Sequence, residues 1–135
     1  MDAGFFRATY DRFAQQYDAT FEAQQRPKIE GLMAAVGAHA GPRLDAGCGT
    51  CLAARLTGLP FVGIDASSGM LTHGIGRRVQ GDVYRLPFAD HQFGLVLCVT
   101  ALIDFTDTAP AIAELWRVLR PGGALAISVL AHERI

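Results

Sequence analysis

Short apolar runs alternate with helical stretches along the chain from residue 43 onward. A continuous apolar run such as Leu95–Val99 is typical of a strand whose two faces are both buried. Runs of this type predict five strands, at Arg43–Ala46, Phe61–Asp65, Arg78–Gly81, Phe93–Val99 and Ala124–Leu130.

Three helix candidates lie between these runs, at Cys51–Thr57, Ser67–Gly76 and Thr108–Leu119. Ser67 or Ser68 is suited to cap the second helix, and Asp107 or Thr108 the third. Strands that alternate with helices predict a parallel sheet with right-handed crossovers. The expected fold class is therefore α/β, a Rossmann-like parallel sheet of about five strands with helices on both faces.

The first 42 residues contain no strand pattern and look helical. Aromatic residues recur there at steps of three and four, which places four of them on one helix face: Phe6, Tyr10, Phe13 and Tyr17. Pro27 suits the first turn of a second helix that continues to about Ala38. We expect a single domain over residues 1–135, with a helical N-terminal cap at 1–42 and an α/β core at 43–135.

Composition narrows the class of protein. Hydrophobic residues make up 50% of the chain and the formal net charge is −1, so nothing favours binding to nucleic acid or to an anionic membrane. No apolar run approaches the roughly 18 residues of a membrane span. The N-terminus lacks the layout of a secretion signal, and an odd count of 3 cysteines fits a reducing compartment. We expect a soluble cytoplasmic protein.

Acids and glycines occur where the predicted strands end. Residues 44–50 read Leu-Asp-Ala-Gly-Cys-Gly-Thr, and Asp65 and Asp82 follow the next two strands. Glycine allows close approach of backbone to a ligand because it has no Cβ. A carboxylate at the end of the second strand can accept hydrogen bonds from ribose hydroxyls. Ligands of such sheets bind beyond the carboxyl ends of the strands, so these residues predict a nucleoside pocket.

The kind of nucleoside follows from two positions. Leu52 occupies the place of the third glycine in a dinucleotide fingerprint, and Asp45 would lie unfavourably near a pyrophosphate. A dinucleotide-dependent oxidoreductase is therefore disfavoured. Asp45 suits an ammonium group instead, and Asp82 could accept a hydrogen bond from an adenine amino group. S-adenosylmethionine has the amine, the ribose and the adenine that this set of residues requires.

The chain resembles the class I S-adenosylmethionine-dependent methyltransferases. The resemblance rests on ordered motifs that span about residues 43–130: Leu44–Thr50, Gly63–Leu71, Gly81–Phe88, Phe93–Val99 and Leu115–Gly123. The variant is similar to the small-molecule enzymes of the ubiquinone/menaquinone-biosynthesis type. The resemblance implies a methyltransferase that uses S-adenosyl-L-methionine.

The resemblance also implies which residues contact the cofactor. It places the loop of Asp45, Ala46, Gly47, Cys48 and Gly49 around the methionine part. Asp65 would hold the ribose, Ala66 and Met70 would flank the adenine, and Asp82 and Val83 would contact its edge. Cys98 and Val99 would lie near the sulfonium, and an N-terminal tyrosine, Tyr10 or Tyr17, would close over the methionine end. No metal site is predicted.

Two features depart from the family pattern. Cys51 stands where glycine is common, so cysteine would be strained there if the backbone requires a positive φ. The family also adds a sixth and a seventh strand, and this chain ends before either. The fifth strand would then be an unprotected apolar edge. Either the chain is a fragment, or a partner covers that edge, for example in a homodimer.

No general base stands out, so the catalytic residues stay unassigned, with His73, His91 and Asp104 as candidates. The fourth strand lacks the Asn-Pro-Pro-Tyr type of segment found in enzymes that methylate nucleic-acid amino groups, which favours a small organic acceptor. The lack of a base leaves a non-catalytic cofactor-binding subunit as the alternative. Cys48-Gly49-Thr50-Cys51 also matches a thioredoxin-like redox signature, which the acids at 65 and 82 disfavour.

Overall fold

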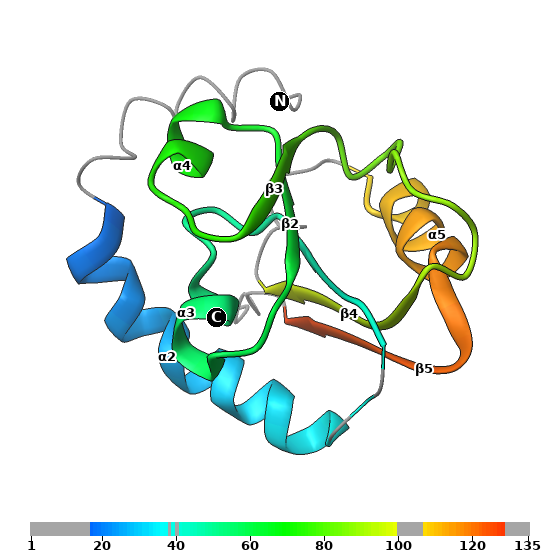
Figure 1. Ribbon diagram of the computed structural model, residues 1–135, viewed down its shortest axis with the longest axis horizontal. Helices are drawn as coiled ribbons and strands as arrows, with labels where there is room; N and C mark the ends of the chain where they lie inside the picture. The colour runs from blue at the N-terminus through cyan, green and yellow to red at the C-terminus, as the bar shows by residue number, and fades with distance from the viewer. Residues whose placement is uncertain (1–16, 38, 40, 100–106, 129–135) are drawn as a thin grey trace, which may run out of the picture.

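The computed structural model describes residues 17–37, 39, 41–99 and 107–128. Five strands form one parallel sheet in the order β3-β2-β1-β4-β5. Their bounds are β1 Arg43–Ala46, β2 Val62–Asp65, β3 Arg77–Gln80, β4 Phe93–Val99 and β5 Leu119–Ser128. The predicted parallel α/β architecture is confirmed (Figure 1).

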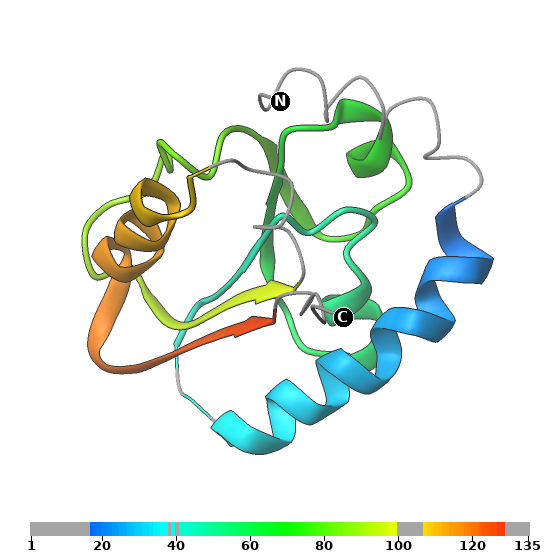
Figure 2. The same cartoon turned by 180° about the vertical axis from the view of Figure 1, so that it is seen from behind.

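Four described helices surround the sheet: α2 Tyr17–Val36, α3 Leu52–Thr57, α4 Ser68–Thr72 and α5 Ala109–Arg117. Figures 1 and 2 show α5 on one side of the sheet and α2 with α3 on the other. None of these helices combines the length and apolar character that a bilayer crossing requires.

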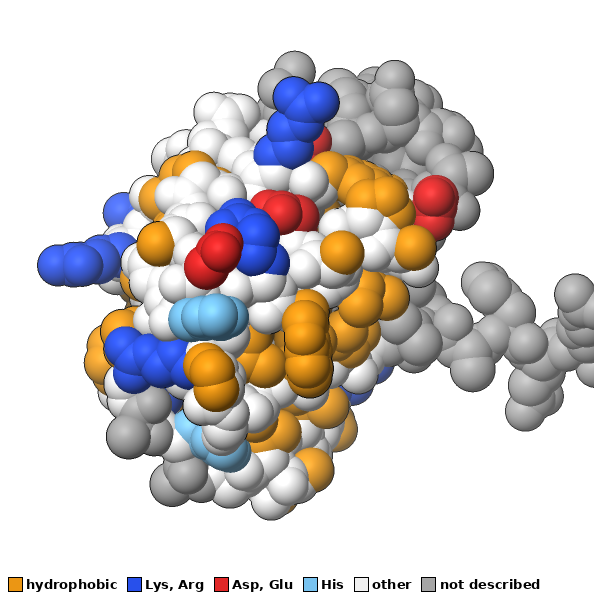
Figure 3. Space-filling view, turned by 90° about the vertical axis from the view of Figure 1, so that its right-hand side faces the viewer, with side chains coloured by type: hydrophobic (Ala, Val, Ile, Leu, Met, Phe, Trp, Pro, Cys, Tyr) orange, Lys and Arg blue, Asp and Glu red, His pale blue; other side chains and the backbone are white. Residues whose placement is uncertain are grey.

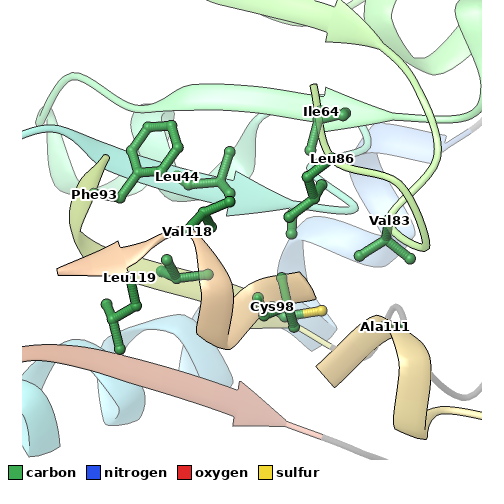
Figure 4. Packing of buried hydrophobic residues seen from close by; sticks show 12 residues of the cluster. Leu44, Ile64, Val83, Leu86, Phe93, Cys98, Ala111, Val118 and Leu119 are labelled. Atoms are coloured by element: carbon green, nitrogen blue, oxygen red, sulfur yellow. The ribbon is translucent and has the colours of Figure 1, made fainter. Parts of the chain in front are cut away.

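Alternation along β4 divides the core between the two faces of the sheet. Phe93, Val96 and Cys98 pack with residues of α5 in one cluster, whose side chains Figure 4 shows converging between the sheet and that helix. Leu95 and Leu97 point to the other face and pack with residues of α2 and α3. A central strand buried on both faces explains the unbroken apolar run in the sequence.

The amino-terminal helix corrects one prediction. Pro27 does not begin a new helix but lies inside α2, which runs without interruption from Tyr17 to Val36. Pro27 is exposed, whereas Ile29 on the opposite face is buried against the sheet. Packing of that apolar face maintains the helix although proline removes one backbone donor. The helix ends before Ala38 because Gly37 adopts a φ of 70°.

The first three members of the aromatic stripe, Phe6, Tyr10 and Phe13, lie outside the described residues. Tyr17 is the first residue of α2.

The start of β5 is also corrected. The strand begins at Leu119 rather than at Ala124, because Leu119 pairs with Phe93 before the register shifts. Gly122, with a φ of 80°, lies in the shifted segment, which carries extra residues relative to β4. Pro121 and the two following glycines hid this pairing from a prediction based on apolar runs.

The helix caps agree with the predicted choices. The Ser67 side chain accepts a hydrogen bond from the Met70 amide at 3.1 Å and so caps α4. Asp107 accepts one from the Ala109 amide at 3.1 Å before α5, whereas the Thr108 side chain makes no capping bond. The helix at α4 is shorter than predicted and ends at Thr72.

Candidate functional site

The site lies beyond the carboxyl ends of the strands, where the order of the sheet reverses. β1 pairs with β2 on one side and with β4 on the other, and such a reversal opens a crevice for ligands. A recess of about 30 Å³, room for a water-sized group, lies there. It is lined by Gln25, Ile29, Asp45, Gly47, Cys48, Leu52, Ala53 and Val99.

The loop after β1 requires glycine at two positions. Gly47 has a φ of 72° and Gly49 a φ of 56°, in the left-handed region that side chains with a Cβ rarely adopt. The amides of Gly47 and Cys48 both donate to the Ile64 carbonyl, at 2.8 and 3.0 Å. The loop is therefore anchored on the end of β2 before the chain enters α3.

Asp45 is a buried carboxyl group that faces this recess. It is 5% exposed, and the described part of the chain supplies no hydrogen bond to it. Burial raises the pKa of Asp45 to about 8, with smaller contributions from the nearby Cys51 thiol and the Asp65 carboxylate. Burial of a carboxyl group is costly unless a hydrogen-bond donor or an opposite charge satisfies it. A cationic group of a ligand, placed in the recess, would supply both.

Asp65 connects the loop after β1, residues 47–51 and called the glycine loop below, to α4. Its Oδ2 accepts a hydrogen bond from the Gly49 amide at 2.8 Å, and its Oδ1 accepts one from the Ser67 amide at 2.9 Å. Both carboxylate oxygens thus bond to backbone amides of neighbouring segments. The Asp65 carboxylate thus fixes the loop geometry in addition to its expected role toward ribose.

The predicted adenine residues lie further along the same edge of the sheet. Asp65 pairs in register with Gln80, which places Asp82 just beyond the next strand end. Asp82 is exposed, and its Oδ1 accepts from the Tyr84 amide at 2.9 Å, which makes it part of a local turn. Met70 and Val83 are buried and Ala66 is half-buried.

The remaining predicted residues divide between site and core. Ala46 and Cys98 are fully buried in the cluster that packs on α5, whereas Val99, the next residue of β4, lines the recess. Cys98 and Val99 were expected together near the sulfonium, whereas strand alternation turns them to opposite faces of the sheet.

The two described candidate bases, His73 and His91, do not line the recess. His91 precedes β4, and its amide donates to the Arg117 carbonyl, so it lies at the opposite edge of the sheet. His73 forms the C-cap of α4. Asp104 lies outside the described residues.

Sequence reasoning missed the contribution of α2. Gln25 and Ile29 of this helix line the recess beside Asp45. The spacing of four residues between them places both on one helix face, which was the available signal. Nothing in the sequence indicates that this face covers the glycine loop.

The backbone at Cys51 fulfils the condition for strain. Cys51 has a φ of 64° and occupies the N-cap of α3 in the left-handed region. Its Sγ lies 3.7 Å from that of Cys48, and both cysteines are free thiols. The glycine that is common at this position in the family would avoid the strain.

Parallel strands with this reversal, a loop of positive-φ glycines and an acid at the end of β2 define a Rossmann-like nucleoside-binding domain. The chain belongs to the methyltransferase domain family, which matches residues 44–127. The resemblance in the sequence is thereby confirmed.

Curated relatives carry two different names. The chain is 36% identical over 138 residues to a demethylmenaquinone methyltransferase of Renibacterium salmoninarum, covering 93% of this chain and 58% of that protein. It is 37% identical over 133 residues to a malonyl-[acyl-carrier protein] O-methyltransferase of Pectobacterium atrosepticum, covering 90% and 49%. The chain thus spans about half the length of the curated relatives it matches.

Solved structures share the fold. A protein of Methanococcus maripaludis assigned to the S-adenosyl-L-methionine-dependent methyltransferases superposes with a TM-score of 0.77 at 20% identity, covering 91% of this chain and 63% of that one. The [4+2]-cyclase SpnF superposes with a TM-score of 0.68 at 25% identity, covering 75% and 43%. Because proteins with different reactions share this fold, function has to be argued from the site.

Proposed function

We propose that this chain forms the cofactor-binding core of an S-adenosyl-L-methionine-dependent methyltransferase that acts on a small organic acceptor. The observation that carries the proposal is the buried carboxyl group of Asp45. It faces the recess between β1 and β4 without a hydrogen-bond donor among the described residues, close to a second carboxylate, Asp65.

The residues present fit this cofactor. The recess next to Asp45 accepts a group of the size of an ammonium ion, and Gly47, a positive-φ glycine, brings backbone to its wall. Asp65 stands at the end of β2, where a carboxylate can accept hydrogen bonds from ribose hydroxyls. Asp82 and Val83 follow β3, where they would meet the adenine edge.

The cofactor, when bound, supplies a methyl group that is already activated on its sulfonium sulfur. The chain itself has to bind, orient and exclude water, because much of the rate effect of such a transfer comes from alignment. Ile29, Leu52 and Val99 give the recess apolar walls that would shield the reacting groups. General-base help is needed only where the acceptor keeps its proton.

The acceptor class is part of the proposal. The two relatives are named for a quinone precursor and for a malonyl group on a carrier protein, and both names point to acceptors other than nucleic acid. A net charge of −1 supports the same choice. An odd count of 3 cysteines supports residence in a reducing compartment, the cytoplasm.

We also propose that two copies associate through β5. This strand is at the end of the sheet order, so among the described strands only β4 pairs with it. Figure 3 shows hydrophobic side chains gathered on the side of the molecule that carries α5, where Trp116 is 68% and Ile112 40% exposed. Sedimentation of the purified chain as a monomer at high concentration would reject this association.

Calorimetry of the reduced protein tests the main proposal. Both S-adenosylmethionine and S-adenosylhomocysteine should bind with one-to-one stoichiometry, and NADH should not. Asp45→Asn keeps the size of the side chain and removes its charge, so it should weaken both ligands. Absence of binding to the wild-type chain overturns the proposal.

A further inference from the structure

The glycine loop contains two buried thiols, Cys48 and Cys51, that lie close enough to form a disulfide after a small movement. The Sγ atoms of Cys48 and Cys51 share a hydrogen bond of 3.7 Å, and the two residues are 7% and 3% exposed. The Cys51 amide donates to the Cys48 carbonyl at 2.8 Å, which closes a turn between them. Such a turn brings its end Cα atoms within about 7 Å, the range that a disulfide bridges.

Two glycines outside the loop make room for the sulfurs. A Cβ at Gly63 would come within 2.7 Å of Cys48 Sγ, and one at Gly74 would come within 2.8 Å of Cys51 Sγ. Both distances are shorter than side chains tolerate, so the backbone of β2 and of the turn after α4 confines the two sulfurs on either side. The pair is therefore held together by its surroundings.

The two sulfurs differ in chemistry. The hydrogen bond with Cys48 lowers the pKa of Cys51 to about 7, with help from the Ile75 amide and the charges of Arg78 and Arg55, although burial opposes the shift. The same contact and burial raise the pKa of Cys48. Near neutral pH a large fraction of Cys51 is thus thiolate, the nucleophilic form, next to the protonated thiol of Cys48.

We propose that Cys48 and Cys51 are a site of two-electron oxidation by a small peroxide, which closes a disulfide in the cofactor loop and lowers cofactor affinity. The Cys51 thiolate attacks a peroxide oxygen and the O–O bond breaks. Hydroxide departs, and Cys51 becomes a sulfenic acid. The Cys48 sulfur then displaces the sulfenic hydroxyl, which departs as water with the Cys48 proton. In sum, two thiols and one hydrogen peroxide give one disulfide and two waters.

The bridge is coupled to the cofactor residues through Gly49. This residue lies between the two cysteines, and its amide donates to Asp65 Oδ2 at 2.8 Å. A disulfide bond of about 2.05 Å requires the two sulfurs to approach each other. Because the Gly63 backbone of β2 packs against Cys48 Sγ, the approach has to come from a movement of the loop that carries the two cysteines. The contact between Gly49 and Asp65 is then lost. This coupling rests on the proposed function, because it acts on the proposed cofactor loop.

The experiment treats the reduced chain with hydrogen peroxide and reads two quantities independently. Alkylation of denatured protein, followed by mass spectrometry, counts free thiols, and calorimetry measures affinity for S-adenosylhomocysteine. We expect wild type to keep one free thiol, Cys98, and to lose affinity at least tenfold, with recovery after dithiothreitol. Cys98→Ala is the matched control and should form the same bridge, whereas Cys48→Ala and Cys51→Ala should form none.

Each alternative result has a distinct meaning. Failure of both wild type and Cys98→Ala to form the bridge would overturn the oxidation site. A bridge that leaves affinity unchanged would overturn its coupling to the cofactor loop. If the reduced protein does not bind S-adenosylhomocysteine at all, the proposed function and the coupling fall together, while the thiol count still decides whether the oxidation site exists.

Discussion

Asp65 accepts a hydrogen bond from the Gly49 amide at 2.8 Å, which joins the end of β2 to the loop after β1. The second oxygen of the same carboxylate holds the Ser67 amide at 2.9 Å. The side chain expected to bind ribose therefore also shapes the loop that would surround the methionine part of the cofactor. Binding and loop geometry depend on one carboxylate.

Asp65→Ala should accordingly weaken S-adenosylhomocysteine binding by about 2–4 kcal/mol, since two charge-assisted hydrogen bonds to the ligand are lost. Calorimetry measures the change. Asp90→Ala is the matched control, because Asp90 is exposed and pairs with Arg117 on the other edge of the sheet. Equal affinities in the two variants would contradict the role of Asp65.

Asp45 should make stability depend on pH. Its pKa is about 8 in the fold and close to 3.8 in the unfolded chain, so between these values only the unfolded chain has lost the proton. The free energy of unfolding should therefore fall as pH rises from about 4 to 8, by up to about 1.4 kcal/mol per pH unit, and level off above. Urea titrations of wild type and Asp45→Asn at pH 5, 6, 7 and 8 isolate this contribution. If the free energies of unfolding of wild type and Asp45→Asn changed with pH in parallel, the pKa of Asp45 would not be raised by folding.

Cofactor binding should release a proton near pH 7. A cationic amine beside Asp45 favours the charged carboxylate, so a group that is protonated in the free protein ionises on binding. Calorimetry in phosphate and in Tris, which differ in ionisation enthalpy, should reveal about one proton released by wild type. Asp45→Asn should release none, and equal release from both would place the proton elsewhere.

The backbone strain at Cys51 predicts an unusual order of two substitutions. Both Cys51→Gly and Cys51→Ala remove the thiol, but only alanine retains a Cβ at a φ of 64°. The glycine variant should therefore be the more stable by about 1 kcal/mol, the reverse of their order inside a helix. Chemical denaturation of the reduced proteins measures the difference. A more stable alanine variant would mean that the loop relaxes to a negative φ.

Arg117 should be a strong determinant of stability on the α5 side. Its guanidinium donates to both carboxylate oxygens of Glu114 at 2.9 Å, to Asp90 at 2.8 Å, and to the carbonyls of Phe88 and Leu86 at 2.9 and 3.0 Å. Lysine cannot reproduce this planar fork. Arg117→Lys should cost about 2 kcal/mol of unfolding free energy, whereas Arg85→Lys, at an exposed position, should cost little. Similar losses in the two variants would count against the network.

The sequence predictions are correct where the structure depends on local signals. β4 has the predicted bounds, because an apolar run buried on both faces leaves a clear signal. β1 also has its predicted bounds, although Arg43 and Asp45 interrupt its apolar pattern. The strain at Cys51 was also foreseeable, since it depends on one local backbone angle.

Tertiary packing decided the rest. Pro27 stays helical because the opposite face of α2 packs on the sheet, and Leu119 joins β5 because Phe93 lies opposite it. His91 is remote from the recess because it precedes a strand rather than following one. The packing of α2 and the pairing of Leu119 are not encoded in a short window of sequence, whereas the place of His91 before a predicted strand is.

The position of β1 at the middle of the sheet has a consequence for synthesis of the chain. Its two neighbours are β2, about twenty residues downstream, and β4, about fifty residues downstream. A ribosome-bound chain therefore exposes one edge of β1 until residue 99 has emerged. Chaperones that capture unpaired strands would have their longest opportunity during that interval.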